Sequence, residues 1–143
     1  MTDKWGRRLF KAGGIALLII GAVHSISFFQ PLLPANETEK QLLDLMSNYK
    51  FNLAGSLRSM DNLLTGFSMC FMLAALAFGA FDLLLSGERA GLLKRAALMN
   101  ILWLVAMTAV SLRLFFIVPT SFLAATLVIF VLAWWKLPAA GAP

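Results

Sequence analysis

Long apolar stretches alternate with short polar segments along this chain, and each stretch is long enough to cross a lipid bilayer. A helix needs about 20 mostly apolar residues to cross the hydrocarbon core. The apolar stretches cover about residues 12–33, 61–85, 96–118 and 121–135. This pattern predicts an all-α, polytopic membrane protein in which residues 1–143 form a single domain, a bundle of four transmembrane helices.

The residues between the stretches indicate where the helices end. Pro31 and Pro34 mark the end of the first span, because proline cannot continue a helix without losing a hydrogen bond. Gly87 follows the second span and is typical of a helix stop. Pro119 and Thr120 alone separate the last two spans, so these spans are predicted to form a tight antiparallel hairpin.

The longest segment between spans, residues 35–60, carries a helical pattern of its own. Asn36 followed by Glu39 is typical of a capping box, in which side chains bond the free N–H groups at a helix start. Apolar residues then recur at helical spacing, at Leu42, Leu45, Met46, Tyr49 and Leu53. The segment is therefore predicted to hold a short amphipathic helix, at about residues 37–50, in the outer loop between the first and second spans.

Composition and charge support a membrane protein and predict its orientation. Hydrophobic residues make up 60% of the chain, more than a small soluble domain could cover. The net charge of +5 comes from basic residues gathered at span ends, so no nucleic-acid partner is expected. The two ends of the chain and the loop after the second span carry most of these residues, which are Lys4, Arg7, Arg8, Lys11, Arg89, Lys94, Arg95 and Lys136. The positive-inside rule therefore predicts that both termini are cytoplasmic.

A single cysteine and a single histidine limit the chemistry available to the chain. Cys70 has no partner cysteine, which excludes an intramolecular disulfide and a paired-thiol redox mechanism. His24 is the only histidine, whereas haem held between helices normally takes two. His24 and Asp61 together would give at most two metal ligands, fewer than a zinc site needs. No metal and no cofactor are therefore expected.

A few ionisable residues fall at or inside the predicted spans, toward the outer side of the membrane. His24 lies roughly 20 Å and Arg113 roughly 27 Å from the cytoplasmic boundary, at a rise of about 1.5 Å per helical residue. Asp61 opens the second span at the outer boundary, and Arg58 precedes it by one turn. Ionisable groups are costly at this depth, so these residues are functional-site candidates.

Neighbouring polar residues extend this set into a predicted cleft. Asp61, Thr65 and Ser68 lie on one face of the second span, at i, i+4 and i+7. Ser27 shares a face of the first span with His24. The candidate catalytic residues are His24, as general acid or base, and Asp61, as its partner. The candidate ligand-binding residues are Arg58, Arg113, Ser27, Thr65 and Ser68.

These residues also have purely structural interpretations. Arg58 and Asp61 have the spacing of an exposed ion pair, which is worth only a few tenths of a kcal/mol. Arg113 is typical of a side chain that reaches from a span end to the lipid headgroups, and His24 of a packing hydrogen bond. Asn100 is a further buried polar residue on a different face of its helix from Arg113, and it is expected to make another contact.

Three sequence motifs carry a family resemblance. They are Gly21–His24 in the first span, Arg58–Asp61 leading to Gly66–Ser68 in the second, and Leu112–Phe116 leading to Pro119 in the third. Together they resemble the motifs of a family of small, uncharacterised four-helix bacterial membrane proteins. The chain departs from that family at Val23, which separates the glycine from the histidine, and at Met60, which replaces an aromatic residue. The resemblance implies a multi-pass protein of the bacterial inner membrane, and it implies no particular activity.

These features favour a binding function in the membrane. The outer half of the bundle is predicted to form a polar pocket for a lipid or another hydrophobic small molecule, with Arg58 and Arg113 holding its head. One alternative is a membrane enzyme of isomerase or hydrolase type that uses His24 and Asp61 on a lipid or isoprenoid substrate. Another alternative is an accessory or scaffold subunit of a larger membrane complex, or a homo-oligomer.

Overall fold

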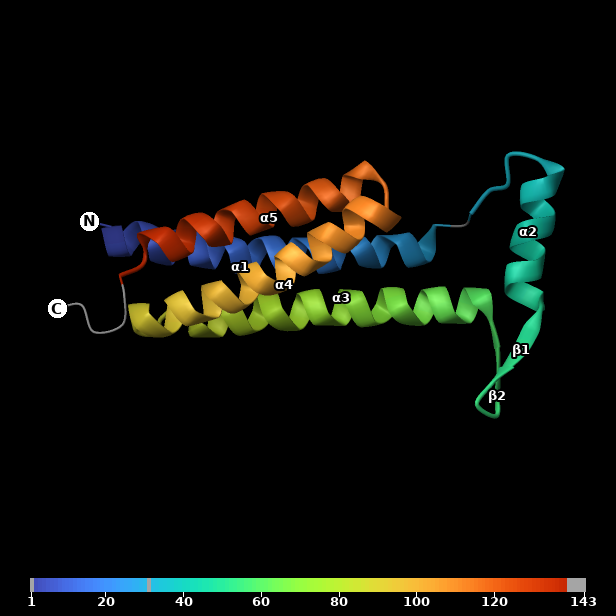
Figure 1. Ribbon diagram of the computed structural model, residues 1–143, viewed down its shortest axis with the longest axis horizontal. Coiled ribbons are helices and arrows are strands. Elements are labelled where there is room, and N and C mark those ends of the chain that lie inside the picture. The colour runs from blue at the N-terminus through green and yellow to red at the C-terminus, as the bar shows by residue number, and fades with distance from the viewer. Residues whose placement is uncertain (1, 31, 139–143) are drawn as a thin grey trace. The chain divides into compact units, whose positions relative to one another are not determined.

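The computed structural model describes residues 2–30 and 32–138 (Figure 1). The contacts of the chain divide it into two compact units. Unit 1 comprises Met1–Ile20 and Ala75–Pro143, and unit 2 comprises Gly21–Ala74. Helices α1 (Thr2–Ile26) and α3 (Met60–Leu85) each contribute to both units. The single domain over residues 1–143 stays a prediction.

Four helices of the described chain are long and apolar enough to cross a membrane. They are α1, α3, α4 (Ala90–Leu114) and α5 (Ile117–Lys136). Their number confirms the predicted spans, and the described chain is mostly helical. The chain therefore has the helices of a multi-pass membrane protein.

The ends of these helices differ from the predicted ends. Helix α1 begins at Thr2, well before residue 12. Its first turns carry charged side chains, but they join the same packed core as the apolar part of the helix. It ends at Ile26 and continues as a short 3-10 helix, η1 (Ser27–Phe29), before an extended Gln30. An extended conformation is the usual one for a residue that precedes proline.

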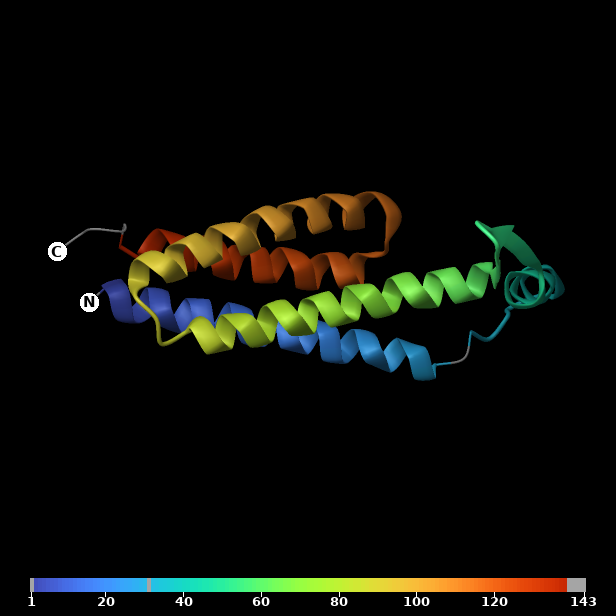
Figure 2. The same cartoon turned by 90° about the horizontal axis from the view of Figure 1, so that it is seen from below.

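The link between α4 and α5 also lies elsewhere than predicted. Helix α4 ends at Leu114, so Phe115 and Phe116 form the connection. Pro119 lies inside the first turn of α5, where proline is tolerated because that turn's N–H groups have no intrahelical acceptor. The predicted tight antiparallel hairpin is present, and Figures 1 and 2 both show the two helices side by side.

The core of unit 1 forms where α1 packs closely on α3 and α5. Phe10 and Phe130 meet edge to face with 5.8 Å between their ring centroids, and both are fully buried. A Cβ atom on Gly13 would lie 2.6 Å from the ring of Phe130. A Cβ atom on Gly79 would lie 2.7 Å from the carbonyl oxygen of Gly14. Glycine at these positions therefore allows three helices to approach one another closely.

Unit 2 holds a short helix and a β-hairpin between the ends of α1 and α3. Helix α2 (Glu37–Asn48) begins at Asn36, whose side-chain oxygen accepts a hydrogen bond from the Glu39 N–H at 2.9 Å. The Glu39 carboxylate accepts from the Ala35 N–H at 2.7 Å. Asn36 is therefore the helix cap, as predicted, and the reciprocal bond reaches one residue further back than in a standard capping box.

The β-hairpin after α2 is not predicted by the sequence analysis. Strands β1 (Lys50–Leu53) and β2 (Ser56–Ser59) pair antiparallel, so Leu53 belongs to a strand and the helix ends before residue 50. Ala54 and Gly55 form the turn with φ of 49° and 86°, which is the left-handed conformation of a type I′ turn. The Gly55 N–H donates to the Asn52 side chain at 2.8 Å. Helical spacing at Leu53 was therefore misleading, because a local turn outweighs the apolar pattern.

Candidate functional site

The candidate residues from the sequence divide between the two units. Arg113, in the last turn of α4, belongs to unit 1, and its proximity to the other candidates stays a prediction. Unit 2 contains the remaining six candidates, which are His24, Ser27, Arg58, Asp61, Thr65 and Ser68. Unit 2 therefore holds all but one of the candidate residues.

His24 lies half-buried near the end of α1, among aromatic rings. Its imidazole packs edge to face against Phe71 at 5.0 Å and against Phe28 at 5.8 Å. The backbone of Ser68 lies beside the ring, so α3 brings Ser68 next to His24. The Nε2 atom of His24 is buried without a hydrogen-bond partner among the described residues. A buried polar atom of this kind needs an explanation, which a polar ligand atom could supply.

Ser27 and Thr65 make weaker cases as ligand-binding residues. The Ser27 hydroxyl donates to the carbonyl oxygen of His24 at 2.7 Å, which satisfies a free carbonyl at the end of α1. Its hydroxyl group is therefore occupied locally. Thr65 is half-buried on α3, between the turns that carry Asp61 and Ser68.

Arg58 and Asp61 are both exposed and form no ion pair with each other in the part of the chain that the structure describes. Arg58 lies on strand β2, opposite Phe51, and donates to the carbonyl oxygen of Leu57 at 2.8 Å. The helical spacing assumed for Arg58 and Asp61 therefore does not apply. Nor does any hydrogen bond found among these residues join His24 to Asp61, which leaves their predicted catalytic partnership without structural support.

A capping box that the sequence prediction missed starts α3 instead. The Ser59 hydroxyl accepts from the Asn62 N–H at 3.2 Å, and the Asn62 side-chain oxygen accepts from the Ser59 N–H at 3.4 Å. Ser59 is 2% exposed, so these bonds are sheltered. The signal was Ser59 followed three residues later by a polar amide, a variant of the usual pattern with Glu or Gln.

An open groove runs along the first turns of α3, with Arg58 at its head. Its lining residues are Arg58, Asn62, Leu63, Gly66, Phe67 and Cys70. Apart from its chain neighbours and the backbone of its own helix, no atom lies within 4 Å of the position that a Cβ on Gly66 would take, so the missing side chain leaves the groove open. From Asn62 to Cys70 the groove follows the helix for about 12 Å. It has a cation and an amide at one end and a mostly apolar floor beyond them.

A deeply buried polar contact lies in unit 1, between residues that were not among the candidates. The Asn100 amide nitrogen lies 3.0 Å from each carboxylate oxygen of Asp82 and 3.2 Å from the carbonyl oxygen of Ala96. Asp82 is 3% exposed and Asn100 is 5% exposed. Asn100 therefore makes a different contact from Arg113, as expected. A carboxylate and an amide inside two successive spans are the sequence signal for such a pair.

Comparison of the chain with family models, curated proteins and solved structures finds no match. The resemblance to the four-helix bacterial family therefore stays a prediction. Among residues 2–30 and 32–138, no three His, Cys, Asp or Glu side chains are grouped as metal ligands.

Proposed function

We propose that this chain is an integral membrane protein that binds an amphipathic lipid with an anionic head along the groove at the start of α3. The observation that carries the proposal is the position of Arg58 and Asn62 at the head of a groove floored by Gly66 and Phe67. A guanidinium group matches the geometry of a phosphate, because two of its N–H groups can donate in parallel. The apolar floor matches an acyl chain.

The surroundings of the groove support a place at the membrane surface. Helix α2 runs across the direction of the first turns of α3 (Figures 1 and 2). Leu42, Leu45 and Tyr49 are 56%, 60% and 65% exposed, although they are apolar or aromatic. An amphipathic helix in the interfacial plane would bury such side chains among the lipid headgroups and acyl chains. In this arrangement Arg58 lies at the level of the headgroups.

Orientation and membrane follow from the same proposal. The basic residues at both ends of the chain support cytoplasmic termini, so the proposal puts the groove in the outer leaflet of the cell inner membrane. His24, in the last turn of α1, is proposed to contact the polar carbonyl groups of such a lipid. Arg113, at the end of α4, is proposed as a second cation of the outer leaflet.

Lipid retention in native mass spectrometry tests the proposal. The protein is released from nanodiscs that contain equal amounts of phosphatidylglycerol and phosphatidylcholine. Arg58→Gln is expected to lower retained phosphatidylglycerol by about tenfold, because a charge-assisted hydrogen bond is lost. Gly66→Leu fills the groove and is expected to lower retention of both lipids.

Matched controls separate the groove from general effects. Lys50→Gln removes the same charge from the same hairpin, and Gly87→Leu adds the same side chain where the Cβ also meets open space. Both controls are expected to retain lipid like the unaltered protein. Wild-type retention in Arg58→Gln and Gly66→Leu would contradict the proposal, as would equal losses in the two controls.

A further inference from the structure

One end of unit 1 gathers most of the cations of the chain. The side chains there are Lys4, Arg7, Arg8, Lys11, Arg89, Lys94, Arg95 and Lys136, and we call this set the basic end. Contacts bring its segments together, because Gly6 packs against Leu137 and Arg7 reaches the backbone of Glu88. Asp3 and Glu88 are the acidic residues beside these segments. The basic end therefore carries a clear excess of positive charge.

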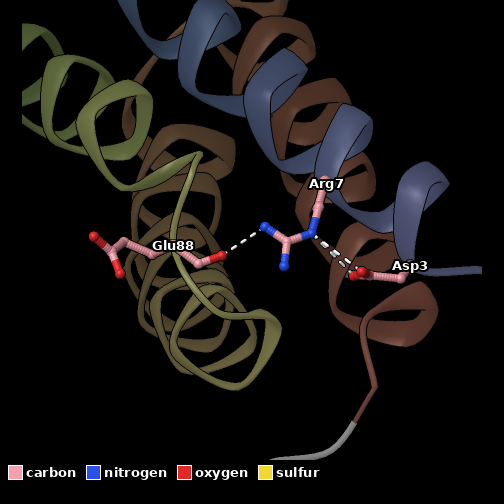
Figure 3. A network of polar contacts seen from close by, with 3 residues as sticks. All are labelled: Asp3, Arg7 and Glu88. Atoms are coloured by element: carbon pink, nitrogen blue, oxygen red, sulfur yellow. Dashed lines mark hydrogen bonds and ion pairs between the residues drawn. The ribbon is translucent and has the colours of Figure 1, made fainter.

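Two of these cations are used inside the protein. Arg7 donates to the carbonyl oxygen of Glu88 at 2.5 Å and to both carboxylate oxygens of Asp3 at 3.2 Å (Figure 3). Lys94 donates to the carbonyl oxygen of Leu137, just past the end of α5, at 2.8 Å. Carbonyl groups near helix ends lack intrahelical donors, so these bonds tie the helices together. Arg7 and Lys94 are therefore not free to bind a ligand.

Two other cations lie over exposed tryptophan rings. The guanidinium carbon of Arg8 is 5.9 Å from the ring centroid of Trp5, and the Nζ atom of Lys136 is 4.4 Å from that of Trp135. Trp5 is 60% exposed and Trp135 is 68% exposed. Stacking holds each charge beside its ring, which reduces the side-chain freedom that binding would otherwise cost.

We propose that the Arg8–Trp5 and Lys136–Trp135 pairs form a binding surface for anionic phospholipids of the leaflet in which the basic end lies. Each pair offers a cation and a large aromatic face, and a phospholipid satisfies both with its phosphate and its glycerol–acyl region. Tryptophan is enriched at this level of the membrane for the same reason. An acidic protein segment would neutralise the cations but leave the rings in water. The inference does not depend on the groove at Arg58.

Quenching of tryptophan fluorescence by brominated lipids tests this surface. Trp103 packs against Phe78 within unit 1, so the measurement uses a Trp103→Phe background. The tryptophans that remain are Trp5, Trp134 and Trp135, beside the basic end. The full chain is reconstituted in phosphatidylcholine vesicles that contain either brominated phosphatidylglycerol or brominated phosphatidylcholine. The anionic lipid is expected to quench about fivefold more effectively at equal mole fraction.

The variant and its control are matched in charge. In the double variant Arg8→Gln with Lys136→Gln, the ratio of quenching by the anionic lipid to quenching by phosphatidylcholine is expected to fall close to one. The control is Lys40→Gln with Lys50→Gln, on the α2–β1 segment, and it is expected to keep the ratio of the unaltered protein. Raising NaCl to about 0.5 M is expected to weaken the preference of the unaltered surface, which tests the proposal without any variant. Equal quenching by the two lipids, or an equal loss in the control pair, would overturn it.

A soluble competitor distinguishes a lipid site from a phosphate site. Glycerol phosphate carries the same head chemistry without acyl chains, and it is expected to leave the lipid preference unchanged at millimolar concentration. If it abolishes the preference, the basic end binds free phosphate and the lipid proposal is wrong.

Discussion

The side-chain amide of Asn100 donates to both carboxylate oxygens of Asp82 at 3.0 Å, between α4 and α3 and almost out of reach of solvent. Asp82 lies where α1 and α3 approach each other closely. A Cβ atom added at Gly14 would lie 3.0 Å from the Cβ atom of Asp82. One polar pair therefore sits where three helices meet. Its effect on stability depends on whether both partners are present.

Removing one partner of this pair should cost more than removing both. Asn100→Leu leaves the Asp82 carboxyl group buried without its donor, and we expect a loss of about 3 kcal/mol in the free energy of unfolding. The double variant with Asp82→Leu should recover part of that loss, because no buried polar group is left unpaired. A double-mutant cycle by detergent or denaturant titration measures the difference. An additive cycle would show that the contact carries no coupling.

The approach of α1 to α3 should not tolerate a methyl group. In Gly79→Ala the new Cβ would lie 2.7 Å from the Gly14 carbonyl oxygen and 2.9 Å from the Leu18 backbone nitrogen, and neither atom can move without shifting a helix. We expect a loss of about 2 kcal/mol, seen as a lower midpoint of thermal unfolding in detergent.

Gly66→Ala is the matched control, because it makes the same change in the same helix where the Cβ meets open space. Alanine is the better helix former, so this variant should be neutral or stabilised by up to about 1 kcal/mol. A loss similar to that of Gly79→Ala would show that the close approach to Gly14 does not account for the loss at Gly79.

The hairpin turn should respond in opposite directions to two substitutions. Gly55→Ala places a Cβ at φ of 86°, and we expect the hairpin to loosen by about 1 kcal/mol. Ala54→Asn creates the Asn-Gly pair that type I′ turns favour, at a residue that already has φ of 49°, and should tighten it. Hydrogen exchange of the amides in β1 and β2 reports both effects. Faster exchange in Ala54→Asn would contradict the assigned turn.

The start of α3 should depend on its cap. Ser59→Ala removes the hydroxyl that accepts from the Asn62 N–H, at an expected cost of about 1 kcal/mol. Amide exchange in the first turn of α3 should accelerate. Ser56→Ala, on the same strand but exposed and outside the cap, is the control and should leave that turn unchanged.

The helices could be predicted from the sequence more readily than the site. Uninterrupted apolar residues identify a span wherever they occur, so all four helices were found. The charged start of α1 was missed because Phe10 is buried by the distant Phe130, a contact that no local pattern contains. The hairpin was missed because Ala54-Gly55 is a weaker turn signal than Asn-Gly.

The candidate site shows the same limit. The contact between His24, in the last turn of α1, and the backbone of Ser68 on α3 depends on how the two helices pack, which the sequence does not specify. Depth counting failed for Arg58, because it assumed a helix where the chain forms a strand. The pairing of Asp82 with Asn100 requires the rotation of two helices about their axes, which spacing within either helix does not specify.

The connection between α4 and α5 has a consequence for how the protein is made. Phe115 and Phe116, both apolar and exposed, are the whole link, so no hydrophilic loop has to be carried through the bilayer between these helices. The two helices can leave the translocation machinery as one preassembled hairpin, with Ser111 and Thr120 already hydrogen-bonded at 2.7 Å. Residues 90–136 would then enter the membrane in a single step, and inverting one helix would require inverting the other.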